Sequence, residues 1–200
     1  MQLTTTMENF TLLASPWWVN LLVLVPFVLF YFFRDRIKIS RKILLAAAVF
    51  GAVFGFVEAA VVVYLRNILA LMTSCLGNAD NVFRPLRSFQ QFEIISRLPN
   101  ELMRIEFFRE AATIIMLLVI AYISAKYWRE RLAIFFWTFA IWDIFYYAGL
   151  WITIKWPPTL TTSDVLFLIP DAWTSQVWFP LLVSLLVILS VLFSREKTIR

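Results

Sequence analysis

Histidine is missing from this sequence, and cysteine occurs only once. Without histidine the chain cannot build a His-ligated haem, a His-ligated zinc site or a Ser-His-Asp catalytic triad. Cys75 stands alone, which excludes an intrachain disulfide, a CxxC pair and the ligand set of an Fe–S cluster. The chemistry open to this chain therefore rests on oxygen-bearing and basic side chains.

Charged residues are also scarce. They make up 16% of the 200 residues, while hydrophobic residues make up 62%. Soluble domains contain about 25% charged and 45–50% apolar residues, so the composition indicates a membrane protein whose partner is the lipid bilayer. The net charge of +5 is explained by basic loop residues that orient a membrane protein, and no nucleic-acid partner is expected.

Long apolar runs divide the chain into membrane spans of roughly 20 residues, the length that crosses about 30 Å of hydrocarbon. The first run has no Lys or Arg before it, which indicates a retained helix instead of a secretory signal. The expected spans are residues 17–33, 43–65, 105–125, 132–152 and 177–193. The predicted fold is an all-α integral membrane protein with a single domain, residues 1–200, built on a bundle of five transmembrane helices.

Two shorter segments are expected on the extracytoplasmic side. Phe89, Phe92, Ile95 and Leu98 recur at helical spacing among polar residues, which predicts an interfacial helix. The segment TTSDVLFLIPDAW is too short to span, and it predicts an interfacial or re-entrant helix capped at Ser163 or Asp164. Six spans is the alternative, if LFLIPDAW or the segment after Arg66 enters the membrane deeply.

Basic residues set the orientation. The stretches RDRIKISRK, KYWRER and SREKTIR alternate with an N-terminus that has no Lys or Arg and a loop near KWPPTLTTSD that has only Lys155. The outer connection from Arg66 to Arg104 carries several Arg, but it is long, and long loops obey the positive-inside rule weakly. Under the positive-inside rule, this alternation predicts a cell or inner membrane with the N-terminus outside and the C-terminus in the cytoplasm.

Glu58 stands inside the second span, in the stretch FGFVEAAVVVY. Gly51, Gly55 and Glu58 share one helix face at i, i+4 and i+7, and small residues at this spacing let another helix approach closely. We therefore expect Glu58 to face protein and not lipid.

The third and fourth spans carry acidic residues as well. Glu106, Arg109 and Glu110 share one helix face, while Asp143 lies near mid-membrane in FAIWDIFYYAGLW. A charged side chain at the membrane centre costs about 2.5–3.5 kcal/mol on insertion scales, which favours convergence on one polar cavity that opens outward. The expected lining is Glu58, Glu106, Arg109, Glu110, Asp143, Tyr146 and Tyr147.

Two polar side chains also have a purely structural interpretation. Arg109 paired with Glu58 or Asp143 would be a buried ion pair that only fixes helix register. Asp164 is interpreted as a helix cap. If a cofactor binds, carboxylate and phenol oxygens suit a hard divalent cation, held by Glu58, Glu110 and Asp143.

Three functions from different classes fit these residues. The leading prediction is binding or movement of a proton, a cation or a small cationic solute through an outward-facing, carboxylate-lined site. One alternative is a non-catalytic subunit or assembly partner of a larger membrane complex, in which the chain binds other membrane subunits or itself. The other is a membrane enzyme with acid–base or metal chemistry on a lipid-borne substrate at the outer leaflet.

Overall fold

In the part of the chain that the structure describes, three helices are long and apolar enough to cross a membrane. They are α2 (Arg41–Cys75), α4 (Asn100–Ser124) and α5 (Trp128–Ile154). The computed structural model describes residues 14–34, 37–75, 100–169 and 172–194. The prediction of a helical membrane protein is thus supported by these three elements, which correspond to the second, third and fourth expected spans.

Two shorter apolar helices accompany them. A 3-10 helix, η1 (Trp17–Leu24), continues directly into α1 (Val25–Phe33), and α6 (Trp178–Ser194) is the last helix described. Pro26 stands at the junction, in the first turn of α1, where a proline is tolerated. These two helices correspond to the first and fifth expected spans.

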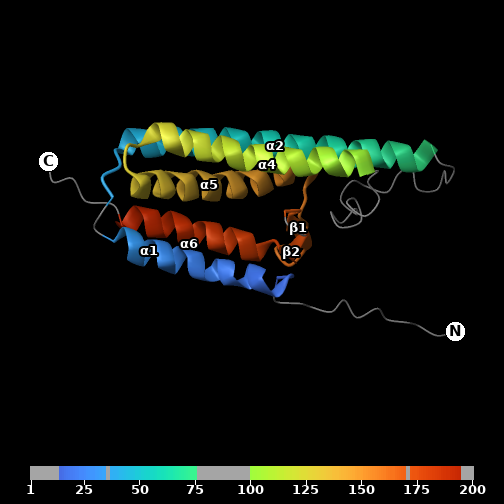
Figure 1. The fold of residues 1–200 in the computed structure, drawn as a ribbon. Helices are drawn as coiled ribbons and strands as arrows, with labels where there is room; N and C mark the ends of the chain where they lie inside the picture. The colour runs from blue at the N-terminus through green and yellow to red at the C-terminus, as the bar shows by residue number, and fades with distance from the viewer. Residues whose placement is uncertain (1–13, 35–36, 76–99, 170–171, 195–200) are drawn as a thin grey trace.

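The apolar helices run side by side, and each runs opposite to the helix that precedes it in the chain, so the packed pairs α2–α5 and α1–α6 are parallel (Figure 1). α5 packs against α2, α4 and α6, and α1 packs against the far side of α6. The connections from α1 to α2 and from α4 to α5 lie at one end of the bundle, as Figure 1 shows. The basic stretches that begin at Arg34 and Lys126 therefore meet at the same end.

Small residues bring α2 and α5 together. A Cβ atom placed on Gly51 would lie 2.8 Å from the carbonyl oxygen of Thr138, and one on Gly55 would lie 2.9 Å from the backbone nitrogen of Tyr146. Both distances are shorter than van der Waals contact, so only glycine fits at these two positions. The predicted close approach at this helix face is confirmed, and the approaching helix is α5.

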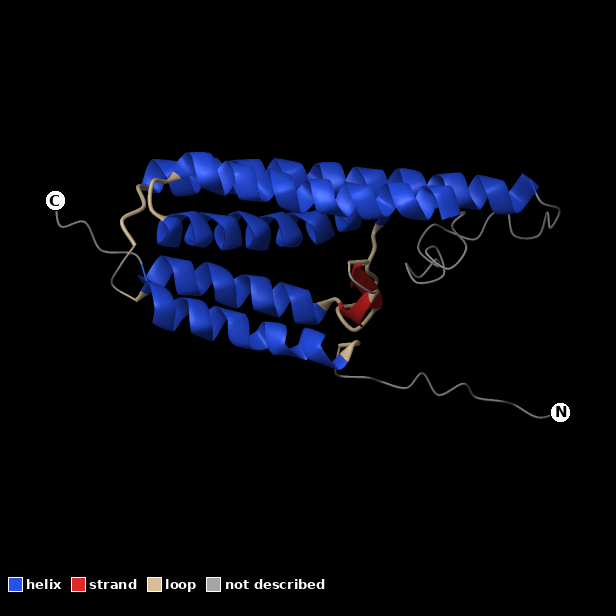
Figure 2. Ribbon diagram, in the orientation of Figure 1, coloured by secondary structure: helices blue, strands red, loops and turns tan. Residues whose placement is uncertain are grey.

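A β-hairpin closes the other end of the bundle. β1 (Ser163–Phe167) pairs antiparallel with β2 (Trp173–Gln176), and the two strands lie beside the start of α6 (Figure 2). The predicted helix in TTSDVLFLIPDAW, capped at Ser163 or Asp164, is therefore wrong. A short apolar run has no decisive period, and here the second strand supplies partners for its backbone N–H and C=O groups.

Two further expectations concern the chain around this end. The second span was expected to end at residue 65, but α2 continues to Cys75. Arg66 does not interrupt the helix, because its guanidinium lies 4.3 Å from the centre of the Trp156 ring in a cation–π contact. The interfacial helix expected around Phe89–Leu98 lies outside the described residues.

Candidate functional site

The helices and the hairpin enclose a cavity of about 550 Å³. Its walls come from α2, α4, α5, α6, η1, the start of α1 and the hairpin. The lining includes all the residues that the sequence placed together: Glu58, Glu106, Arg109, Glu110, Asp143, Tyr146 and Tyr147. The seven side chains therefore share one cavity, as expected.

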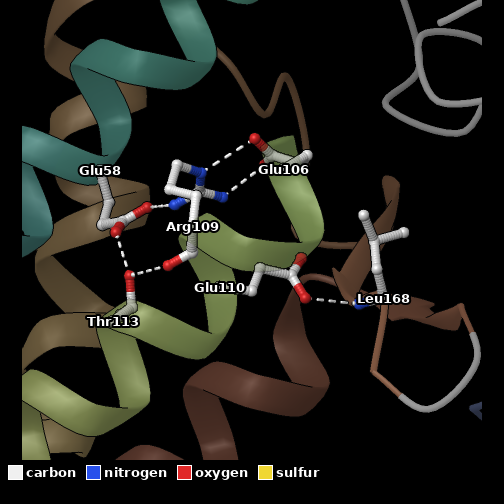
Figure 3. Close-up of polar contacts among 6 residues, drawn as sticks. All are labelled: Glu58, Glu106, Arg109, Glu110, Thr113 and Leu168. Carbon is white, nitrogen blue, oxygen red and sulfur yellow. Dashed lines mark hydrogen bonds and ion pairs between the residues drawn. The ribbon is translucent and has the colours of Figure 1, made fainter. Parts of the chain in front are cut away.

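Arg109 links two carboxylates from different helices (Figure 3). Its Nε donates to Glu106 Oε2 at 2.9 Å and its Nη2 donates to Glu106 Oε1, one turn earlier on α4. Its Nη1 forms an ion pair with Glu58 on α2. A single guanidinium therefore serves both carboxylates, and it joins α4 to α2. Of the two partners proposed for Arg109, the structure has Glu58 and not Asp143.

Thr113 completes the surroundings of Glu58. Its hydroxyl donates to Glu58 Oε1 at 2.5 Å, and it also lies 3.1 Å from the carbonyl oxygen of Arg109, four residues earlier. Glu58 itself is buried, with 5% of its surface exposed. The sequence analysis missed Thr113, although its place one turn beyond Arg109 on the same helix face was a usable signal.

Glu110 turns away from this group toward the hairpin (Figure 3). Its Oε2 accepts a hydrogen bond of 2.8 Å from the backbone N–H of Leu168. Leu168 directly follows β1, so this contact ties the tip of the hairpin to α4. The hairpin thus forms a wall of the cavity that is held by a cavity carboxylate.

Asp143 and Tyr147 have different partners. Asp143 Oδ2 accepts a hydrogen bond of 2.8 Å from the Ser184 hydroxyl of α6. The hydroxyl of Tyr147 donates to Asp164 Oδ2 on β1, also at 2.8 Å. Asp164 is therefore a buried acceptor and not the helix cap that the sequence suggested. Tyr146 lines the cavity, and its ring stacks on that of Trp142.

Asp164 lies outside the membrane-spanning helices, on the hairpin. Burial raises the pKa of its carboxyl from 3.8 to about 6, because the charged form loses its water. The hydrogen bond from Tyr147 and the positive charge of Arg66 lower the pKa in turn, but by less than burial raises it. Arg66 and Asp164 were both missed as parts of the site, since Arg66 follows an expected span and Asp164 lies in a strand that was predicted to be a helix.

Aromatic rings form much of the remaining wall. Phe167 of the hairpin stacks on Phe139 with ring centres 6.1 Å apart, and it lies 6.3 Å from Trp142 and 5.6 Å from Trp173. The indole nitrogens of Trp142 and Trp173 are buried, and neither has a hydrogen-bond partner among the residues that the structure describes. Two buried indole donors are thus without an acceptor in the part of the chain that the structure describes.

The acidic side chains do not form a metal cluster in the described ranges. No three Asp, Glu or Cys residues there lie in a position to hold a metal ion. The expected ligands Glu58, Glu110 and Asp143 each accept a hydrogen bond from a different protein partner, Thr113, Leu168 and Ser184 respectively. The binding of a divalent cation stays a prediction, and the described residues contain no preformed group of ligands for it.

Acidic groups outnumber basic groups among the described residues that line the cavity. Among the described residues, those that line it include four carboxylates and two guanidinium groups, the latter from Arg66 and Arg109. Carboxylates in low-dielectric surroundings are costly unless a proton or a positive charge neutralises them. The chemistry that this arrangement allows is the binding of protons or of a cation.

Comparison of the chain with protein-family models, with curated proteins and with solved structures gives no match. The function must therefore be inferred from the cavity itself.

Proposed function

We propose that this chain is a five-span membrane protein whose cavity binds a cation within the membrane and moves it, with protons exchanging on the same carboxylates. The observation that supports this proposal is the charge of the cavity wall, where the described part of the chain contributes four carboxylates and two guanidinium groups. A cation entering the cavity restores neutrality and displaces protons from the carboxyl groups.

The placement of the cavity in the membrane is part of the proposal. At 17 residues, α6 is at the short end of the range for a spanning helix. It runs antiparallel to α5, beside which it packs, and this favours a full crossing. The basic stretches at one end of the bundle favour a cytoplasmic location for that end, in a cell or inner membrane. The hairpin end then lies outside, together with the N-terminus, and the carboxylates of the cavity are reached from there.

The contacts of the carboxylates favour the exchange of protons and a cation over a purely structural role. Arg109 shares its positive charge between Glu58 and Glu106, so it cannot neutralise both. Glu110 and Asp143 accept hydrogen bonds from uncharged donors only, among the contacts described above. A structural ion-pair network would account for Arg109 with Glu58 and Glu106, but it does not account for Glu110 and Asp143. The alternatives of a complex subunit and of a membrane enzyme stay predictions.

Proton release tests this proposal. Purified protein in weakly buffered detergent is mixed with the chloride of sodium, potassium, tetramethylammonium or tetraphenylphosphonium, and a soluble pH dye reports released protons. We expect at least one of these cations to release protons from the wild type, and to release far fewer from Glu58→Gln combined with Asp143→Asn.

Glu130→Gln is the matched control, because Glu130 lies near the cytoplasmic start of α5 and does not line the cavity. This variant should release protons like the wild type. No release with any of the four cations, or equal release from the double variant, would contradict the proposed function.

A further inference from the structure

We infer that the ligand of this cavity is an organic cation, with an apolar aromatic body and an uncharged hydrogen-bond acceptor that meets the indole N–H of Trp142. This inference rests on the proposed function and names the class of its ligand. It is carried by three features of the cavity that the charge of its wall does not explain: its size, its aromatic lining and its unsatisfied donors.

Size is the first feature. A bare metal ion is held by oxygen atoms about 2.0–2.6 Å away and needs only a small, closely surrounded site. The cavity measures about 550 Å³, which falls within the range of roughly 300–1,000 Å³ that is typical of sites for organic ligands. A proton or a metal ion alone would leave most of this space unused.

The second feature is the aromatic wall. Phe139, Trp142, Phe167 and Trp173 form a continuous group of rings, with neighbouring ring centres 5.3–6.3 Å apart. Aromatic faces bury an apolar body and also attract a positive charge placed over them. The rings and the carboxylates line the same cavity, so one molecule with an apolar part and a cationic part can contact both.

The third feature is the donor of Trp142. This side chain is 8% exposed, it lines the cavity, and its Nε1–H has no partner among the described residues. Indole can only donate, and a buried donor without an acceptor is rare because it loses its bond to water. Asp143, one residue further along α5, already accepts the hydroxyl of Ser184. An oxygen of the ligand would satisfy Trp142, and Nε1 of Trp173 is a second buried donor on the hairpin side.

A matched pair of probes tests the acceptor. The first is 4-benzoylbenzyltrimethylammonium, a diaryl ketone with a quaternary ammonium group. The second is 4-benzylbenzyltrimethylammonium, in which a methylene group replaces the carbonyl. Both have the same charge and nearly the same shape, so a difference in affinity reports the oxygen. Binding is measured by isothermal titration calorimetry on the full chain in lipid nanodiscs.

We expect the wild type to bind the ketone about tenfold more tightly than the methylene compound, a difference of about 1.4 kcal/mol. Trp142→Phe should abolish this preference and leave the affinity for the methylene compound nearly unchanged. Trp137→Phe is the control, because the indole of Trp137 already donates to the carbonyl oxygen of Leu44 at 3.0 Å and does not line the cavity. This variant should keep the tenfold preference.

Photolabelling gives a second measurement that needs no variant. The ketone cross-links to nearby C–H bonds under ultraviolet light, and digestion of the wild type should then place the label on segments that contain Trp142 or Phe167. Labels confined to segments that do not line the cavity would overturn the inference.

The two proposals fail in different ways. Equal affinity for both compounds in the wild type, or a preference that survives in Trp142→Phe, overturns the inference but leaves cation binding intact. The same holds if neither compound binds while small cations still release protons. If no cation binds or releases protons, the proposed function itself has failed.

Discussion

At the scale of single residues, Arg109 joins two helices of the cavity wall, α4 and α2. Its guanidinium serves Glu58 and Glu106, and 23% of its side chain is exposed. Arg109→Gln would leave two buried carboxylates without their positive partner, and we expect the free energy of unfolding to fall by about 3 kcal/mol, the lower end for a broken buried pair. Unfolding by added sodium dodecyl sulfate, followed by circular dichroism, measures this change.

Two further variants isolate the cause of that loss. Arg104→Gln removes an exposed charge from the same helix, and a loss of less than about 1 kcal/mol is expected there. Adding Glu58→Gln to Arg109→Gln should recover part of the stability, because one unpaired carboxylate is removed as well. If the double variant is no more stable than Arg109→Gln alone, charge pairing is not the reason for the loss.

Asp164 makes a separate, pH-dependent contribution. Burial raises its pKa from 3.8 to about 6, so between these values the folded protein holds a proton that the unfolded chain has released. The stabilisation is complete below pH 4 and is lost as the pH rises through about 6. A shift of about two pKa units corresponds to about 3 kcal/mol.

The measurement compares the wild type with Asp164→Asn. The free energy of unfolding of the wild type should fall relative to that of the variant between pH 4 and pH 7, and the difference should be constant above pH 7. Parallel pH curves for the two proteins would show that Asp164 keeps an ordinary pKa in the folded state.

At the scale of elements, the contact between α2 and α5 allows almost no added volume. A Cβ at Gly55 would overlap backbone atoms of α5, which cannot rotate away as a side chain can. We expect Gly55→Ala to lower the free energy of unfolding by about 1–3 kcal/mol, as overpacking does. Ala46→Leu, on the exposed face of the same helix, adds more volume but should change stability little. Similar losses in both variants would mean that the close approach is not responsible.

The sequence predicted this contact because helix geometry alone places Gly51 and Gly55 on one face. It also predicted that the acidic residues of three helices share one cavity, since unpaired charges in a membrane are costly. It could not choose the partners within that cavity. Whether Arg109 pairs with Glu58 or Asp143 depends on helix rotations of a fraction of a turn, which no spacing rule fixes.

The hairpin was missed for a different reason. The run from Val165 to Ile169 is apolar throughout, so it has neither a helical nor a strand period. Its conformation is decided by β2, by the Tyr147 hydroxyl on Asp164 and by the Glu110 carboxylate on the N–H of Leu168. These partners are distant in sequence, and local propensity does not reveal them.

At the scale of the whole molecule, the number of crossings decides which side of the membrane reaches the cavity. If α1 and α6 cross together with α2, α4 and α5, residues Ser15 and Thr161 lie outside, and Lys38 and Lys126 lie in the cytoplasm. If only the three long helices cross, Ser15 and Lys38 lie on the same side. The position of Ser15 relative to Lys38 therefore separates the two topologies.

Single cysteines at these four positions, introduced after Cys75→Ser removes the native thiol, test the arrangement in intact cells with a membrane-impermeant maleimide. We expect labelling at Ser15 and Thr161 and none at Lys38 and Lys126, because the positively charged connections stay in the cytoplasm. Permeabilised cells are the control, in which all four positions should react. Equal labelling of Ser15 and Lys38 in intact cells would contradict five crossings. Labelling of Lys38 and Lys126 with protection of Thr161 would invert the orientation, and the hairpin end of the cavity would then face the cytoplasm.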